Sequence, residues 1–337
     1  MVNDESIELD HGGGGYKSWE LLQDIRGALK SRGKWQNCED DAAVYDLSSS
    51  VIPAKAGIHS KLVFTSDAFI VEPIFFPGGD IGKIAMCGTI NDLSVMGAKP
   101  LGISLSIVME EGFSKTDLMK IMRSINKVSE ESGVPVVTGD TKVMQKGKID
   151  KIEITTAGVG LADRVIENKG IKAGDVIISS GDLGEHAVTL LASRFNYKTK
   201  IISDSKPLNK EIEKVGEYLN ACKDPTRGGL AANIVEMANK SRVKIVLDEK
   251  TLPYKKETVA VSELLGIDIF ALASEGRFIA SVSPKNADKV LEILKKFNNE
   301  AKVIGHAEAG SGVYLKTKLG ALRPIEMPKG KLIPRIC

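Results

Sequence analysis

The strongest secondary-structure signal in the sequence lies between residues 101 and 137. Residues 101–109 alternate large apolar side chains with mostly small ones, which is the period of two expected of a strand with one buried face. Ser114 and Asp117 then resemble a capping box, and apolar residues recur with helical spacing through 118–128. The valine-rich segment 134–137 follows. A strand, a helix and a second strand in this order predict a crossover that returns the chain to the same sheet.

The second half of the chain mixes strands and helices again. Helices are predicted to begin near Glu185 and after Ser283, and strands are predicted at 176–178, 243–247 and 278–282. The periodicity lapses between these halves, around 163–174, where charged residues and glycine dominate. The sequence therefore predicts an α+β protein with two domains and a tail. The predicted boundaries are 1–165, 166–320 and 321–337.

Charge and cysteine spacing exclude several classes of protein. The formal net charge of +2 is spread along the chain, so neither a nucleic-acid partner nor a membrane surface is expected. The four cysteines lie far apart, which argues against a disulfide framework and fits a reducing compartment. No apolar run reaches the roughly 18 residues that a membrane span needs. We therefore expect a cytoplasmic protein without a membrane segment.

The sequence ends on a cysteine, Cys337, in a segment that is rich in proline and glycine. Pro324, Pro328, Gly330 and Pro334 disfavour a helix or a central strand, so we expect an extended and mobile tail. A thiol on such a tether could carry a chemical group between sites. Composition alone fits a solvated cysteine without a role equally well, and both interpretations stay open at this point.

Five aspartates lie in four separate segments of the chain, four of them in a loop-like setting: Asp40, Asp41, Asp67, Asp92 and Asp140. Gathered carboxylates repel one another unless a positive charge lies among them. Oxygen ligands in this number suit magnesium or calcium, and substrate phosphates usually complete a magnesium site. A nucleotide site is one interpretation, and five separate cap or turn residues are the other. The sequence contains no Walker loop and no dinucleotide glycine fingerprint, so a phosphate cradle here must be of another kind.

A set of motifs across nearly the whole chain resembles the HypE family of hydrogenase maturation proteins, within the PurM-like, or AIR-synthetase-like, superfamily. The aspartate and glycine motifs are shared across that superfamily, whereas a terminal Pro-Arg-Ile-Cys is specific to the HypE family. The motifs are His11 to Gly15, Asp40 to Ala43, Phe75 to Gly82, Asn91 to Leu93, Thr138 to Lys142, Asp224 to Arg227 and Pro334 to Cys337.

The resemblance implies a fold, an activity and partners. The fold would be a two-domain α+β fold whose N-terminal domains share a β-barrel in a homodimer, with ATP and Mg²⁺ bound near the dimer seam. The activity would be ATP-dependent dehydration of a carboxamide carried on Cys337 to a thiocyanate. A HypF-type carbamoyltransferase would supply the carbamoyl group. A HypC–HypD iron scaffold complex would receive the cyano group for the nickel-iron hydrogenase.

The resemblance also implies roles for individual residues. The catalytic group would be Cys337, Glu275 and Lys142, and the metal ligands would be Asp41, Asp67, Asp92 and Asp140. ATP would further contact Asp40, Asn91, Thr141, Gly13, Gly14, Thr226 and Arg227. The chemistry fits these residue types: ATP turns the amide oxygen into a phosphate leaving group, and two N–H protons must leave. Glu275 could accept a proton if burial raises its pKa, and Lys142 could shuttle one or neutralise phosphate.

Two departures from the family pattern concern histidines. Ala187 stands where relatives often have a glycine after the histidine, and the loop after His11 is all glycine where a serine or alanine is usual. We therefore expect His11 and His186 to be loop or cap residues. Two alternative functions remain: a small-molecule kinase or synthetase of the same superfamily, or a non-catalytic scaffold that uses the thiol of Cys337 for docking.

Overall fold

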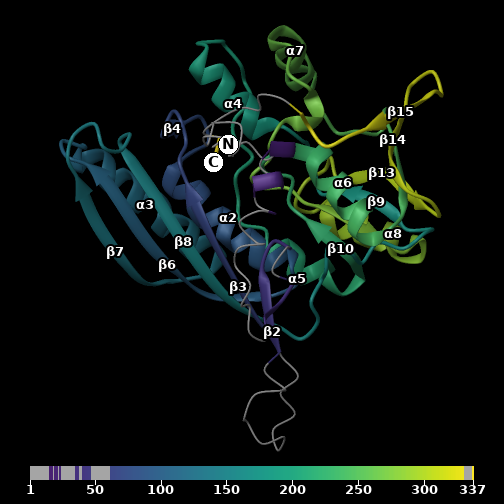
Figure 1. The fold of residues 1–337 in the computed structure, drawn as a ribbon, viewed down its shortest axis with the longest axis horizontal. Helices are drawn as coiled ribbons and strands as arrows, with labels where there is room; N and C mark the ends of the chain where they lie inside the picture. The colour runs from purple at the N-terminus through teal and green to yellow at the C-terminus, as the bar shows by residue number, and fades with distance from the viewer. Residues whose placement is uncertain are drawn as a thin grey trace, which may run out of the picture.

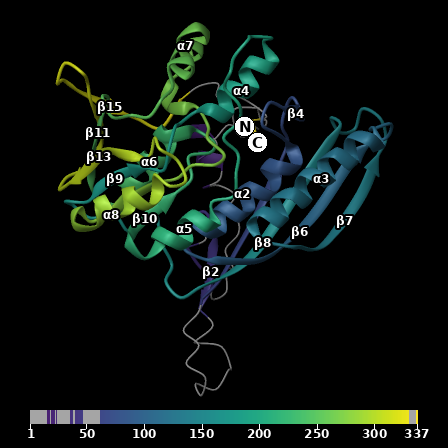
Figure 2. The same cartoon turned by 180° about the vertical axis from the view of Figure 1, so that it is seen from behind.

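In the described part of the chain, the computed structural model contains two large sheets that lie side by side, and helices cover each of them (Figures 1 and 2). It describes residues 15–17, 19–21, 23, 35–37, 40–46, 61–329 and 336–337. His11, Gly13, Gly14 and residues 330–335 lie outside this part of the chain. Within the described part, no helix is both long and apolar enough to cross a membrane.

Six strands form the N-terminal sheet in the order β1-β2-β3-β8-β6-β7. Its strands are β1 (Trp35–Gln36), β2 (Ala43–Asp46), β3 (Lys61–Phe69), β6 (Lys99–Glu110), β7 (Val136–Met144) and β8 (Ile152–Ala162). The predicted crossover is confirmed, because β6 and β7 pair in parallel and helix α3 (Lys115–Ser132) connects them. Ile103 and Ile107 are buried as the alternation predicts, but Leu101 is 47% exposed. A register shift beside it, between Pro100 and Gly102, interrupts the alternation.

Helix α2 (Ile81–Val95) packs between the N-terminal sheet and α3, and it passes through the centre of the molecule (Figure 1). Asp80 caps this helix, since its side chain accepts a hydrogen bond from the Lys83 N–H. Ser114 caps α3 by accepting from the Asp117 N–H, which confirms the predicted cap. The two caps fix where both helices begin, next to the short hairpin of β4 (Phe75–Phe76) and β5 (Gly79–Asp80).

Seven strands form the C-terminal sheet in the order β10-β12-β9-β13-β11-β14-β15. Its strands are β9 (Val176–Ser179), β10 (Leu219–Lys223), β11 (Lys244–Asp248), β12 (Ile279–Val282), β13 (Lys302–Glu308), β14 (Gly312–Lys316) and β15 (Leu322–Ile325). The helices are α4 (Glu185–Arg194), α5 (Asn209–Val215), α6 (Gly229–Ser241), α7 (Lys256–Leu265) and α8 (Pro284–Leu294). The strands and helix starts predicted for this half are therefore present.

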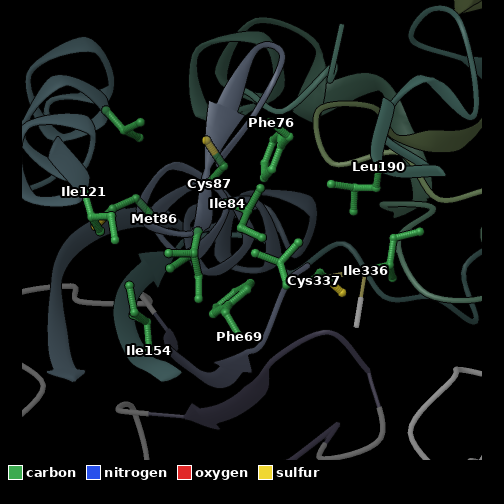
Figure 3. Close-up of a cluster of buried hydrophobic side chains, with 14 of the residues drawn as sticks. Phe69, Phe76, Ile84, Met86, Cys87, Ile121, Ile154, Leu190, Ile336 and Cys337 are labelled. Atoms are coloured by element: carbon green, nitrogen blue, oxygen red, sulfur yellow. The ribbon is translucent and has the colours of Figure 1, made fainter. Parts of the chain in front are cut away.

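Two described parts of the predicted tail, residues 322–325 and 336–337, pack against the rest of the protein. Leu322–Ile325, expected in a mobile tail, instead pairs with β14 as the last strand of the sheet. An edge strand tolerates Pro324 because one side of it needs no hydrogen-bond donor. Ile336 and Cys337 are only 6% and 9% exposed. They lie in the apolar cluster around Phe69, Phe76, Ile84 and Leu190 that Figure 3 shows.

One buried side chain connects α2 with two segments of the second half. The Asn91 amide donates to the carbonyl oxygens of Lys206 at 3.2 Å and Glu275 at 3.1 Å. Its oxygen accepts from the Leu208 N–H at 2.8 Å. Asn91 therefore satisfies three backbone groups that would otherwise be buried without partners.

A substitution at Gly82 tests the close packing of α2 against α3. A Cβ atom there would lie 2.7 Å from the Ile121 side chain and 2.9 Å from its carbonyl oxygen. We expect Gly82→Ala to lower the free energy of unfolding by about 1 kcal/mol, because overpacking costs about 1–3 kcal/mol and the gain in helix propensity is about 1 kcal/mol. Denaturant unfolding measures the change.

Gly216→Ala is the matched control, since the nearest atoms to its added Cβ lie at 3.6 Å and 3.7 Å. This control should unfold at the wild-type denaturant concentration or slightly above it, because only the stabilising gain of alanine over glycine applies there. A Gly82→Ala protein as stable as the wild type would contradict the close approach of the two helices.

Candidate active site

Three carboxylates from distant parts of the chain meet between the two sheets. Asp41 precedes β2, Asp92 lies in the last turns of α2, and Asp224 follows β10. One oxygen of each lies within 4.8 Å of the others. Burial and the charges of neighbouring aspartates, Asp67 first, raise the pKa of Asp92 well above its usual value. Burial and Asp41 raise the pKa of Asp224 to about 7. A cation at this point would relieve the repulsion.

The protein partners of these three carboxylates leave one oxygen available to such a cation. Thr65 donates a hydrogen bond to Asp92 at 2.8 Å, and the ammonium group of Lys223 contacts one oxygen of Asp41. The other oxygen of Asp41, Oδ2, is buried and has no hydrogen-bond partner. A buried carboxylate oxygen without a partner is costly. This orphan oxygen and the three converging carboxylates fit the hard oxygen ligands that a divalent cation prefers.

Asp67 and Arg227 lie beside the cluster. Asp67 projects from β3, where the Thr89 hydroxyl donates to it at 3.3 Å. Burial raises the pKa of Asp67, and the nearby charge of Arg227 opposes that rise. Arg227 belongs to the loop between β10 and α6, as does Thr226, whose backbone N–H donates to the Asp224 carbonyl oxygen. The predicted residues Asp41, Asp67, Asp92 and Arg227 are thus brought together.

Glu275 and Cys337 form the other side of this region. Glu275 precedes β12, is buried, and has one carboxyl oxygen, Oε1, without a hydrogen-bond partner. Burial raises its pKa well above the usual value, and the charges of Asp224 and Asp204 add to the rise. The Cys337 thiol makes a side-chain hydrogen bond with Glu275, and burial raises the pKa of that thiol. A thiol and a carboxyl group suited to proton transfer therefore lie next to each other.

Two of the predicted nucleotide-binding residues have structural partners instead. Asp40 pairs with Lys240 at 2.8 Å and also accepts from the Asn168 N–H at 3.4 Å. Asn91 uses its amide group to hold three backbone groups. The polar atoms of both side chains are engaged with protein groups in this structure, and their contact with ATP stays a prediction.

Asp140, Thr141 and Lys142 do not join the cluster within one chain. They lie on β7, an edge strand exposed along its whole length. Asp67 is in register with Gly139 through β8 and β6, so three strand spacings, about 14 Å, separate them. Asp140 then points to the opposite face of the sheet, where it pairs with Lys142 at 2.8 Å. Asp140 therefore does not join Asp41, Asp67 and Asp92 within one chain, and its predicted role as a metal ligand stays a prediction.

Sequence reasoning missed Asp224 as a member of the cluster. The signal was present, because Asp224 begins the motif Asp-Pro-Thr-Arg that was singled out for its threonine and arginine. The prediction of His186 as a loop or cap residue is also wrong. Its ring is fully buried in the first turn of α4.

Comparisons with known proteins agree with this geometry. Models of the AIR synthase related proteins match the chain at residues 39–162 (N-terminal domain) and 172–318 (C-terminal domain). A putative hydrogenase expression/formation protein of Methanocaldococcus jannaschii is 42% identical over 97% of this chain and 98% of that protein. The carbamoyl dehydratase HypE of Rhizobium leguminosarum bv. viciae is 37% identical over 98% of this chain and 95% of that protein.

Solved structures show the same relationship. A HypE–HypF complex has a TM-score of 0.82 and 36% identity, covering 91% of this chain and 99% of the matched chain. A HypE structure in complex with ATP has a TM-score of 0.80 and 32% identity, covering 98% of this chain and 100% of the matched chain. Relatives are 37–42% identical over nearly the full length of the chain, and solved HypE structures share its fold. This chain therefore belongs to the HypE family of hydrogenase maturation proteins, within the AIR synthase related proteins.

Proposed function

We propose that this protein is a carbamoyl dehydratase, which uses ATP to convert a carboxamide on the sulfur of Cys337 to a thiocyanate. The observation that carries the proposal is the contact between the Cys337 thiol and Glu275 at the edge of the buried aspartate cluster. Relatives at 34–42% identity include several named carbamoyl dehydratase HypE, and a HypE structure with ATP shares the fold.

The reaction removes one oxygen and two protons from the carboxamide. ATP supplies a phosphoryl group to the amide oxygen, so that the carbon–oxygen bond breaks with phosphate as the leaving group instead of hydroxide. The two N–H protons leave as the carbon–nitrogen triple bond forms. The balanced products are the thiocyanate on Cys337, ADP, hydrogen phosphate, which keeps one of the two protons, and one free proton.

Glu275 is the proposed acceptor for one of these protons. It is buried and in contact with the sulfur, and its raised pKa makes it a stronger base than an exposed glutamate. Arg227 lies close enough to Asp67 and Glu275 for its charge to act on both. Its place fits charge stabilisation of a phosphoryl group near the sulfur.

We assign Mg²⁺ to the cluster of Asp41, Asp92 and Asp224, with Asp67 beside it. The converging oxygens and the orphan Oδ2 of Asp41 support this assignment. Magnesium bound there would neutralise phosphate charge. Lys223 already neutralises part of the negative charge of Asp41.

A homodimer would complete the site with residues of β7. The exposed edge of β7 carries large apolar side chains, among them Val137 and Val143, which are 64% and 65% exposed. Such an edge favours pairing with a second copy. In that arrangement Asp140, Thr141 and Lys142 would act in a site shared by the two subunits, as the family resemblance implies.

The partners follow from the same chemistry. A HypF-type carbamoyltransferase would load Cys337, in keeping with the HypE–HypF complex that this chain resembles. A HypC–HypD iron scaffold would then accept the cyano group. Cys87, Cys222 and Cys337 are all free thiols, which suits a reducing compartment such as the cytoplasm.

Intact mass of the protein tests the proposed reaction. After incubation with a HypF-type carbamoyl donor and ATP, Cys337 should first gain the mass of a carboxamide and then lose that of one water. Cys337→Ala should bind ATP but gain no mass. A carboxamide retained on wild-type protein while ATP is hydrolysed would refute the dehydration, and turnover of a free small molecule by Cys337→Ala would favour a superfamily kinase.

Replacing Asp92 should separate stability from metal binding. Asp92→Asn removes a charge from a group of repelling carboxylates and keeps an acceptor for Thr65, so the metal-free variant should melt no lower than wild type. Its Mg²⁺-dependent ATP affinity should fall about tenfold or more. Calorimetric titration measures the affinity. The exposed pair of Asp117 with Lys120 makes Asp117→Asn the control, and equal affinities in both variants would contradict the metal assignment.

The pH dependence of the dehydration step should report Glu275. The ionised carboxylate is the base, so the single-turnover rate should fall as the pH drops through the pKa of Glu275. Because that pKa is raised, the fall should occur well above the pH at which an exposed glutamate titrates. Glu275→Gln should lose this dependence and slow the step about a hundredfold or more. An unchanged pH profile in the variant would assign the proton transfer to another group.

A further inference from the structure

The last two residues of the chain are held by groups from both halves of the molecule. The Ile336 carbonyl oxygen lies 2.7 Å from His186 Nε2, and a backbone carboxylate oxygen of Cys337 accepts from the Ile70 N–H at 3.4 Å. His186 belongs to α4, whereas Ile70 follows β3. Ile336 also packs into the apolar cluster that contains Phe69, Phe76 and Leu190 (Figure 3). These contacts place the sulfur of Cys337 against Glu275.

The ring of His186 has one protonation pattern that satisfies its partners. A carbonyl oxygen can only accept, so Nε2 carries the hydrogen that is donated to Ile336. Burial lowers the pKa of His186 to about 4, so the ring is neutral near pH 7 and Nδ1 is an acceptor. The Ser203 hydroxyl, 2.8 Å away, is then the donor to Nδ1, and the Ser205 hydroxyl, 3.1 Å from it, must donate to Ser203 because Ser203 has only one hydroxyl hydrogen.

Groups other than Ile336 also hold the ring of His186 in place. Ser203 is itself fixed, since its hydroxyl oxygen accepts from the Ser205 N–H at 3.2 Å and its backbone N–H donates to the Pro77 carbonyl oxygen at 2.9 Å. The ring of Phe76 packs edge-on against the imidazole, with centroids 5.4 Å apart. A side chain fixed on both sides can bind a mobile partner at a low entropic cost.

We propose that His186 is a positioning residue that holds the Ile336 carbonyl oxygen and thereby places the sulfur of Cys337 at Glu275. The importance of this contact for catalysis rests on the proposed dehydration, but the contact itself does not. The bond is made to the backbone, so it holds the segment whether the sulfur is free or carries a carboxamide. Releasing the bond frees the segment so that the sulfur can reach a donor or an acceptor.

The substitutions His186→Gln and His186→Asn distinguish positioning from a structural role. The amide nitrogen of glutamine can replace Nε2 and still donate to Ile336, whereas asparagine is too short to reach it. Thr189→Val is a control for general damage to α4, because Thr189 is buried in that helix and bonds to the Glu185 carbonyl oxygen.

The first measurement is the rate at which a maleimide labels Cys337, read by peptide mapping so that the other cysteines do not interfere. The docked thiol is buried and its pKa is raised, so labelling of wild type should be slow. His186→Asn should be labelled about fivefold faster, the change expected for one lost hydrogen bond of ordinary net strength. His186→Gln and Thr189→Val should label at the wild-type rate. Equal rates for the glutamine and asparagine variants would overturn the proposal.

The second measurement is the single-turnover dehydration of carbamoylated protein at a range of ATP concentrations. His186→Asn should lower the maximal rate by a similar factor and leave the ATP concentration for half-maximal rate unchanged, because His186 has no part in the aspartate cluster. A shift in the ATP dependence instead would indicate a general structural defect and contradict a positioning role. If wild type keeps its carboxamide, the proposed dehydration fails, and the labelling rates still decide the role of His186.

Discussion

Repulsion among buried carboxylates is the constraint on which the rest of this structure depends. Asp41, Asp92 and Asp224 come from three distant segments and meet within a few ångströms. Such a grouping is stable only with positive charge among it. Lys223 supplies part of that charge from the protein, and the orphan oxygen of Asp41 marks where more is needed. Binding of a cation and its nucleotide at this site would therefore lower the electrostatic repulsion among the three carboxylates.

The two halves of the molecule supply different residues to this site. The N-terminal sheet and α2 supply Asp41, Asp67 and Asp92, whereas the loops before α6 and β12 supply Arg227 and Glu275. Asn91 holds the carbonyl oxygen of Glu275 directly, so the position of the proposed base is coupled to the helix that carries Asp92. The reacting sulfur is brought to this junction by contacts from both halves, through His186 and Ile70.

Local patterns predicted much of the fold and part of the site. The helix cap at Ser114 and the crossover depend on neighbouring residues, and both are present. The alternation before Ser114 is present except at Leu101. Asp41, Asp67 and Asp92 could be proposed because acids at the ends of apolar segments often face ligands. The sequence pattern alone could not distinguish Asp140 from these three aspartates. The structure distinguishes it, because Asp140 lies on an exposed edge strand. Asp224 and the buried ring of His186 depend on how the two halves pack, which no local pattern encodes.

The central claim is that the oxygen of a carboxamide on Cys337 leaves as phosphate beside Glu275. The direct test labels that carboxamide with heavy oxygen and follows the label during a single turnover with ATP. The account predicts that the heavy oxygen appears in inorganic phosphate in step with formation of the thiocyanate. Heavy oxygen released into water, or still held on the protein after ATP is spent, would contradict it.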